Sequence, residues 1–242
     1  MNLLVAIPVY NEHKYVERVL DAVERYCGQI LVIDDGSTDG TADILANRRG
    51  IRLIRHPHNQ GYGQSLIDAF AHADAQNFDW VITMDCDEQH EPERIPDFIQ
   101  AIQSDQWDIV SGSRYLEPTA TDDLPPTDRR RINATITATL NARLGLELTD
   151  AFCGFKAHRV SAMRCVNLDQ TGYAFPMQLW PAAVRAGLRI TEIPVRLIYN
   201  DPNRHFGGNL DDPSNRLNHY LSVMEAEIER GRVAIPSCCG CE

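Results

Sequence analysis

Short apolar segments alternate with amphipathic helical patterns along the first half of the chain. Each apolar segment ends in polar, turn-forming residues that lead into the next helical pattern. This order is typical of α/β proteins, in which helices connect the parallel strands of one sheet. Strands are expected at 3–8, 29–34, 51–55, 80–84 and 108–113, and helices at 14–26, 39–47, 62–74 and 93–103. We therefore expect a mostly parallel central sheet flanked by helices.

The second half of the chain continues the pattern after an irregular connection. Residues 116–128 are rich in Pro, Thr and Asp, which is typical of an exposed connection and of a loop that can act as a lid. Beyond it we expect helices at 129–144, 177–186 and 214–230, a turn at 154–156, a strand at 190–198 and a loop at 200–212.

The chain length favours a single domain. A chain of 242 residues with 43% hydrophobic content can bury one large core. We expect this domain over residues 1–232, followed by a flexible cysteine-rich tail over 233–242. The tail offers the thiols of Cys238, Cys239 and Cys241 but no histidine, so a role for it in metal binding is disfavoured.

Two carboxylates follow the apolar run Trp80–Met84 at a predicted strand end. Asp85 and Asp87 are two residues apart, and Gln89 follows at the same spacing. Side chains at this spacing point to one face, so the three can converge on one hard cation such as Mg²⁺ or Mn²⁺. Acidic residues are also common in turns, so the D-x-D pattern needs support from its context.

Two other predicted strand ends supply that context. One leads into Pro8–Glu12 and the other into Asp34–Thr41, and parallel strands bring such ends to one edge of a sheet. The dinucleotide-binding pattern G-x-G-x-x-G is missing after the first strand. Carboxylates would repel a diphosphate unless a dication lay between them, so the missing glycines and the D-x-D pattern support each other.

Five motifs in this order resemble those of family 2 glycosyltransferases, most closely the dolichol-phosphate mannosyltransferase branch. They are Pro8-x-Tyr10-Asn11-Glu12, Asp34-Asp35-Gly36-Ser37-x-Asp39-Gly40-Thr41, Asn59-x-Gly61-x-Gly63, Asp85-x-Asp87-x-Gln89-His90 and Gly112-Ser113-Arg114-Tyr115. A weaker likeness continues through Asp150–Lys156 to about Val195. The resemblance implies a GT-A fold, a nucleotide-diphosphate sugar donor and inversion at the anomeric carbon.

The resemblance also implies roles for particular residues. The donor nucleotide would contact Pro8, Tyr10, Glu12, Ile33, Asp35, Asp85, Cys86 and Asp87, and the metal would be held by Asp85, Asp87 and Gln89. An acceptor phosphate would contact Arg114, Arg129, Arg130, Lys156 and Arg204. The residues implied to be catalytic are Asp87, Arg114 and Asp150. Several of these residues could instead have purely structural roles: Tyr10 could pack on the sheet, Glu12 could cap a helix, and Lys156 could be a surface lysine.

Three consecutive arginines, Arg129–Arg131, begin a predicted helix for which Asp128 is a plausible N-cap. Cations in a first turn oppose the helix dipole, so the run suggests a bound anion nearby. A solvated basic face is the alternative, most of all for Arg131.

Two departures from the branch concern the acceptor. Gln178 stands where a glutamate is often found, and a neutral amide cannot act as a base. A phosphate acceptor is already anionic and needs no base, so this favours phosphate, whereas a sugar hydroxyl would need Asp150 as the base. Arg204 is present, but the Ser-Lys pair expected after it is missing.

The net charge of −11 and the pI near 5.1 argue against nucleic acid as the partner. No apolar run approaches the roughly 20 residues that span a bilayer, so we expect no transmembrane segment. The N-terminus does not look like a signal peptide, and the cysteine spacing shows no disulfide framework. These features predict a cytoplasmic protein that is soluble or peripheral to the membrane.

The leading hypothesis is a metal-dependent inverting glycosyltransferase. It would move a hexose, mannose or glucose in the first place, from a GDP- or UDP-hexose to a polyprenyl-phosphate-like acceptor. Alternatives are the same donor with a soluble sugar or protein hydroxyl as acceptor, a sugar nucleotidyltransferase, and a non-catalytic nucleotide-sugar binding module.

Overall fold

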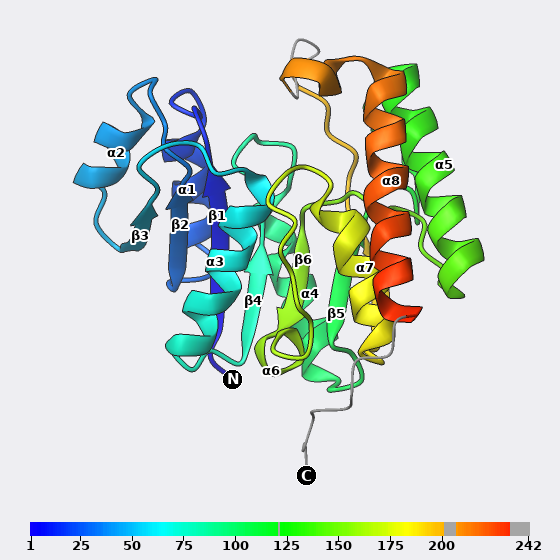
Figure 1. Ribbon diagram of the computed structural model, residues 1–242. Coiled ribbons are helices and arrows are strands. Elements are labelled where there is room, and N and C mark those ends of the chain that lie inside the picture. The colour runs from blue at the N-terminus through cyan, green and yellow to red at the C-terminus, as the bar shows by residue number, and fades with distance from the viewer. Residues whose placement is uncertain (121, 201–206, 233–242) are drawn as a thin grey trace.

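The computed structural model describes residues 1–120, 122–200 and 207–232. Within them, one sheet of seven strands has the order β3-β2-β1-β4-β6-β5-β7 (Figure 1). The strands are β1 (Leu3–Val9), β2 (Ile30–Asp34), β3 (Ile51–Arg55), β4 (Trp80–Thr83), β5 (Ile109–Ser113), β6 (Lys156–Arg159) and β7 (Ile190–Pro194). Strand β6 runs antiparallel to both of its neighbours, and the other paired strands are parallel. The predicted mostly parallel α/β fold is confirmed.

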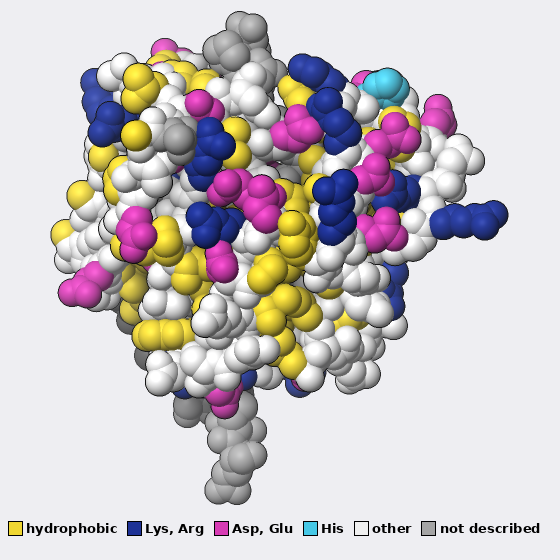
Figure 2. Space-filling view, turned by 180° about the vertical axis from the view of Figure 1, so that it is seen from behind, with side chains coloured by type: hydrophobic (Ala, Val, Ile, Leu, Met, Phe, Trp, Pro, Cys, Tyr) yellow, Lys and Arg dark blue, Asp and Glu magenta, His cyan; other side chains and the backbone are white. Residues whose placement is uncertain are grey.

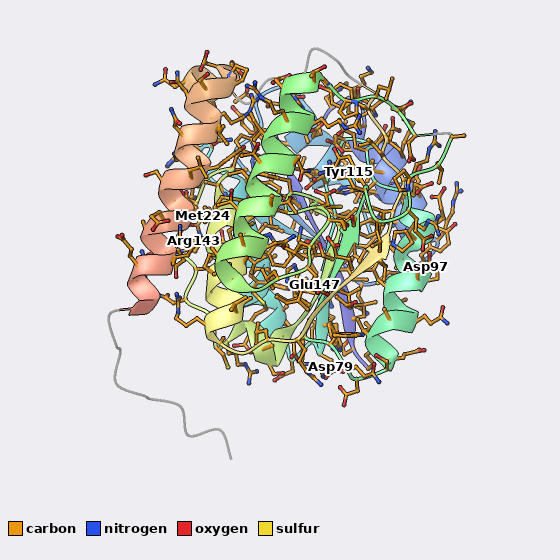
Figure 3. All side chains as sticks on the ribbon, turned by 90° about the vertical axis from the view of Figure 1, so that its right-hand side faces the viewer. Asp79, Asp97, Tyr115, Arg143, Glu147 and Met224 are labelled. Carbon is orange, nitrogen blue, oxygen red and sulfur yellow. The ribbon has the colours of Figure 1, made fainter. Side chains whose placement is uncertain are left out.

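Helices cover both faces of this sheet. They are α1 (Val16–Glu24), α2 (Thr41–Asn47), α3 (Tyr62–Ala75), α4 (Ile95–Gln103), α5 (Thr127–Leu144), α6 (Val160–Met163), α7 (Phe175–Arg185) and α8 (Pro213–Arg232), with 3-10 turns η1 (Pro92–Arg94) and η2 (Gly208–Asp211). Helices α1 and α4 pack on one face, and α3, α7 and α8 contribute to the core of the other. Figure 3 shows α5 and α8 side by side, where Arg143 forms a bidentate ion pair with Glu225.

The central strands β1, β2 and β4 are almost wholly apolar because both faces of the sheet are covered there. Successive residues of β1 point to opposite faces, so Leu4 and Ala6 join one core cluster while Val5 and Ile7 join the other. Charged side chains of both signs are interspersed over the upper part of the face seen in Figure 2.

Three local predictions differ from the structure. A turn is predicted at 154–156 and no strand after it, but residues 156–159 form strand β6 because this segment pairs with β4 and β5. Helix α5 begins at Thr127 after Pro126, so Asp128 is not the N-cap and instead forms an ion pair with Arg216 at 2.7 Å.

The last strand is also shorter than predicted. It ends at Pro194, and the chain beyond it bonds to the connection after β5: Asp123 accepts from the Tyr199 amide at 2.8 Å. The predicted tail with Cys238, Cys239 and Cys241, and the side chain of Arg204, lie outside the described residues.

Candidate active site

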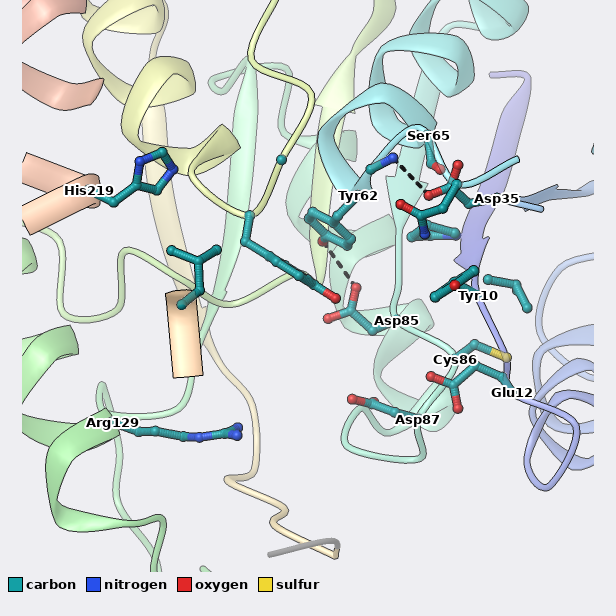
Figure 4. A pocket seen from close by; sticks show the side chains of 17 residues that line it. Tyr10, Glu12, Asp35, Tyr62, Ser65, Asp85, Cys86, Asp87, Arg129 and His219 are labelled. Carbon is teal, nitrogen blue, oxygen red and sulfur yellow. Dashed lines mark hydrogen bonds between the residues drawn. The ribbon is translucent and has the colours of Figure 1, made fainter. Parts of the chain in front are cut away.

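A cavity of about 370 Å³ opens where three parallel strands end (Figure 4). Its lining includes Pro8 at the end of β1, Tyr10 and Glu12 after it, Asp35 after β2, and Asp85, Cys86 and Asp87 after β4. The predicted convergence of the three strand ends is therefore confirmed. Ile33 is different, because its side chain is fully buried in the core and does not line the cavity.

The D-x-D carboxylates are held in place by neighbouring groups. Oδ1 of Asp85 accepts a hydrogen bond from the Tyr62 hydroxyl at 3.0 Å, and the Asp85 amide donates to Nδ1 of His90 at 3.1 Å. Oδ1 of Asp87 accepts from the Gln89 amide at 3.0 Å. A Cβ at Gly154 would overlap the Asp85 carboxylate, so a side chain there would displace that carboxylate. Both carboxylates therefore have restricted orientations at the cavity wall.

Asp85 and Asp87 fit a hard divalent cation. Both offer carboxylate oxygens to the same cavity, and the described residues contain no cluster of three His, Cys, Asp or Glu side chains that would form a closed protein site. Mg²⁺ commonly takes one or two carboxylates and completes its shell with substrate phosphates and water. Such a cation would thus be shared with a bound diphosphate. Gln89, the third predicted ligand, lines a second, adjoining cavity instead.

Asp35 lines the first cavity and forms several hydrogen bonds with the loop before α3. Its carboxylate accepts hydrogen bonds from the amides of Gln60 at 2.7 Å and Gly61 at 2.9 Å, and it bonds to Nδ1 of His56 at 2.6 Å. Burial disfavours the charged His56 imidazole, but its bonds to Asp35 and Asp68 raise its pKa overall. Asp35 thus holds the loop that leads into α3.

Ser65 was missed by the sequence reasoning. It lies one turn into α3, is fully buried and lines the first cavity, and its hydroxyl has no hydrogen-bond partner. A buried unpaired hydroxyl facing a cavity is available to a ligand. No local pattern distinguishes this serine from others in the sequence.

The second cavity, of about 200 Å³, adjoins the first and has aromatic, aliphatic and charged residues in its lining. Its charged lining includes Arg114, Arg129 and Arg216. The aromatic residues are Tyr62, Tyr115, Phe152, Tyr173, Tyr199 and Tyr220. Sequence reasoning missed them, because they are scattered over the chain and converge only in the folded structure.

Arg114 is fixed by a buried carboxylate. Its Nε and a terminal nitrogen donate to the two oxygens of Asp150 at 2.6 and 2.9 Å. Asp150 also accepts from Asn133 Nδ2 at 2.8 Å and from the Phe152 amide at 3.1 Å, and it is fully buried. Although burial opposes ionisation, Arg114 and Asn133 hold the pKa of Asp150 well below its usual range.

This arrangement argues against Asp150 as a general base. Such a low pKa leaves little tendency to take a proton, and Asp150 lines neither cavity. Its position supports a role in orienting Arg114.

The other predicted cations occupy different environments. Arg129 lines both cavities, and its guanidinium lies 5.4 Å from the centre of the Tyr199 ring. Arg130 is exposed on α5 and lines neither cavity. Lys156 is buried in β6, with Nζ 5.3 Å from the Trp180 ring, and burial lowers its pKa. Arg114 and Arg129 thus line these two cavities, whereas Lys156 lines neither.

The inference drawn from Gln178 needs correction. Its side chain is buried and lines neither the first nor the second cavity, so its neutral amide carries no information about a base. Oε1 accepts from the amides of Asp169 at 2.9 Å and Gln170 at 2.7 Å. Nε2 donates to carboxylate oxygens of Asp169 at 2.6 Å and Glu227 at 3.1 Å. Gln178 therefore holds the 169–173 loop beside the cavities.

The mostly parallel sheet, with carboxylates lining a cavity at its strand ends, has the arrangement expected of a GT-A glycosyltransferase. The chain belongs to glycosyl transferase family 2, whose sequence profile matches residues 4–166. The predicted family is thereby confirmed. Membership in it argues against the two alternative hypotheses, a sugar nucleotidyltransferase and a non-catalytic binding module.

Two named relatives match this chain over most of their own length. The chain is 31% identical over 209 residues to an undecaprenyl-phosphate mannosyltransferase from Micrococcus luteus, covering 82% of this chain and 84% of the relative. It is 29% identical over 242 residues to a polyprenol monophosphomannose synthase from Mycolicibacterium smegmatis, covering 95% and 88%.

Among solved structures, glucosyl-3-phosphoglycerate synthase from Mycobacterium tuberculosis, in complex with Mn²⁺, UDP and phosphoglyceric acid, has a TM-score of 0.71 at 20% identity. The match covers 98% of this chain and 80% of that one, and it supports the fold. None of the helices in the described part of the chain has both the length and the apolarity needed to cross a membrane.

Proposed function

We propose that this glycosyltransferase moves a hexose, mannose or glucose, from a GDP- or UDP-hexose to a polyprenyl-phosphate-like acceptor. The transfer would depend on Mg²⁺ or Mn²⁺ and would invert the anomeric carbon. The relatives named for undecaprenyl phosphate and polyprenol support this acceptor class. Such a lipid resides in a membrane, so the protein would work at the cytoplasmic membrane surface.

One observation carries the proposal: two cavities of different chemistry share a wall. The first has carboxylates that suit a cation and a diphosphate, and the second combines aromatic rings with guanidinium groups. Tyr62, Tyr173 and Arg129 line both. An apolar cavity with a few fixed cations suits a lipid that carries a phosphate.

The donor would lie in the first cavity, with Pro8, Tyr10, Glu12 and Asp35 around the nucleoside. Asp85 and Asp87 would hold the divalent cation, which supplies positive charge to the diphosphate leaving group. Cys86 lies between them, and its side chain is buried at the same wall.

The acceptor phosphate would lie in the second cavity near Arg114 and Arg129. Two further polar atoms of this lining, Gln89 Nε2 and the Tyr199 hydroxyl, are buried without a hydrogen-bond partner and can donate to an anion. A phosphate oxygen is anionic at neutral pH, so it can attack without a base. The new bond forms at the anomeric carbon on the face opposite the departing diphosphate, which gives inversion.

The test is transfer of radiolabelled hexose from GDP-mannose, GDP-glucose, UDP-mannose or UDP-glucose to a short polyprenyl phosphate, with Mg²⁺, Mn²⁺ or EDTA. We expect a lipid product that needs the metal and at least about a hundredfold loss in Asp87→Asn. Glu225→Gln, which alters a surface pair far from both cavities, is the control. Absence of a lipid product with every donor would contradict the proposal.

A further inference from the structure

We propose that Tyr62 and Tyr173 form the binding subsite for the transferred hexose, at the boundary between the two cavities. This rests on the proposed function, because it assumes that the donor diphosphate and the acceptor occupy the first and second cavities respectively. The reacting carbon must lie between the leaving and attacking oxygens. The hexose therefore has to lie against the residues that line both cavities.

The two tyrosines make up an aromatic part of that wall. Their ring centres are 6.0 Å apart with planes at 17°, so the rings are stacked. Both residues line both cavities. Tyr173 keeps 41% of its surface exposed, which leaves ring surface for a ligand. A stacked aromatic pair presents an apolar surface suited to the C–H face of a sugar ring.

The pair also touches the predicted metal site. The Tyr62 hydroxyl donates to Oδ1 of Asp85 at 3.0 Å, and Figure 4 shows this bond at the cavity wall. A hexose packed on this wall would then lie beside the carboxylate that faces the donor diphosphate. Tyr62 thus joins the sugar subsite to the D-x-D motif and orients Asp85.

The fold brings the two rings together through close backbone contact. A Cβ at Gly61 would overlap the Thr171 carbonyl, and a Cβ at Gly63 would overlap that of Gln170. The Gln64 amide donates to the Thr171 carbonyl at 3.1 Å. The glycines that flank Tyr62 therefore let the 169–173 loop approach α3, and Gln178 fixes the loop from the other side.

The first experiment compares binding of a nucleoside diphosphate with binding of the same nucleotide carrying its sugar. Dissociation constants for GDP and GDP-mannose, and for UDP and UDP-glucose, are measured by calorimetry with Mn²⁺. In Tyr173→Ala we expect unchanged binding of the diphosphate and about tenfold weaker binding of the nucleotide sugar, equivalent to about 1.4 kcal/mol. Tyr26→Ala, which removes a tyrosine of similar exposure, 40%, outside both cavities, is the matched control.

Tyr62→Phe separates the ring from its hydroxyl. The retained ring should preserve the difference between diphosphate and nucleotide-sugar affinity, while loss of the bond to Asp85 should raise the Mn²⁺ concentration needed for half-maximal binding several-fold. The melting temperature of each variant verifies that it is folded.

The outcomes are distinguishable. The subsite is refuted if Tyr173→Ala weakens the binding of both ligands equally, or of neither, even where wild-type transfer occurs. It is also refuted if Tyr62→Phe leaves the Mn²⁺ concentration for half-maximal binding unchanged. If wild-type protein binds no nucleoside diphosphate with any metal, the proposed function itself fails.

Discussion

At the scale of single residues, burial decides which charged side chains can take part in chemistry. Asp150 and Lys156 are both ionisable and both lie in a recognisable motif, yet both are buried and line neither the first nor the second cavity. Arg114 reaches the second cavity because Asp150 compensates its charge from behind. The motif at 112–115 thus supplies the cation that faces the cavity, and the segment at 150–156 supplies the carboxylate that holds it.

The two roles weighed for Asp150 predict different results for Asp150→Asn. Asp150 is the fully buried partner of Arg114, so its loss should lower the free energy of unfolding by about 3–5 kcal/mol. A residue acting only as a base would reduce kcat and leave stability unchanged. Urea denaturation decides between them, with Glu225→Gln as a surface-pair control expected to cost at most about 1 kcal/mol.

Gln178 provides a second prediction at this scale. In Gln178→Glu a carboxylate would face the carboxylates of Asp169 and Glu227, and two donated hydrogen bonds would be lost. We expect the free energy of unfolding at pH 7 to fall by about 2–4 kcal/mol. Adding Glu227→Gln should recover part of this loss. Equal stability of Gln178→Glu and wild type in urea would contradict the role assigned to the amide.

At the scale of elements, the start of α3 and the 169–173 loop act as a unit. The N-x-G-x-G pattern resembles a family motif in the sequence, but its physical function is a close backbone approach that the sequence cannot display. Gly63 does not have a positive φ, so its requirement is one of space.

Gly63→Ala should separate α3 from the loop. The added methyl would overlap the Gln170 carbonyl, so we expect a loss of about 1–3 kcal/mol in stability and weaker nucleotide-sugar binding. Gly28→Ala is the matched control, since nothing lies within 4 Å of a Cβ there. Similar thermal unfolding and binding in both variants would show that the loop can move at no cost.

At the scale of the whole molecule, the sheet contains a buried histidine that makes stability depend on pH. His158 in β6 is 1% exposed, and its Nδ1 has no hydrogen-bond partner. Burial, and then the charge of Lys156, lower the pKa of His158 from 6.5 to about 3. Below pH 6.5 the unfolded chain therefore binds a proton that the native protein does not.

The protein therefore becomes less stable as the pH falls. The stability associated with neutral His158 is fully present above pH 6.5 and is lost as the pH falls toward 3, with a slope of up to about 1.4 kcal/mol per pH unit. His158→Leu should remove this slope from denaturation curves measured between pH 6.5 and 4. The exposed His58→Leu is the control, and an unchanged slope in His158→Leu would count against a neutral buried imidazole.

The sequence by itself determined the α/β class, most element positions and the strand ends that build the first cavity. These features follow from local patterns, since apolar runs, turn residues and motif spacing are all contiguous in the chain. Strand β6 was missed because four residues pair only through distant partners in β4 and β5. The tertiary structure alone decided which polar side chains face the cavities, because burial of Asp150, Lys156 and Gln178 depends on elements far away in sequence. It likewise brought Tyr62 and Tyr173 together, through a backbone contact between segments more than one hundred residues apart.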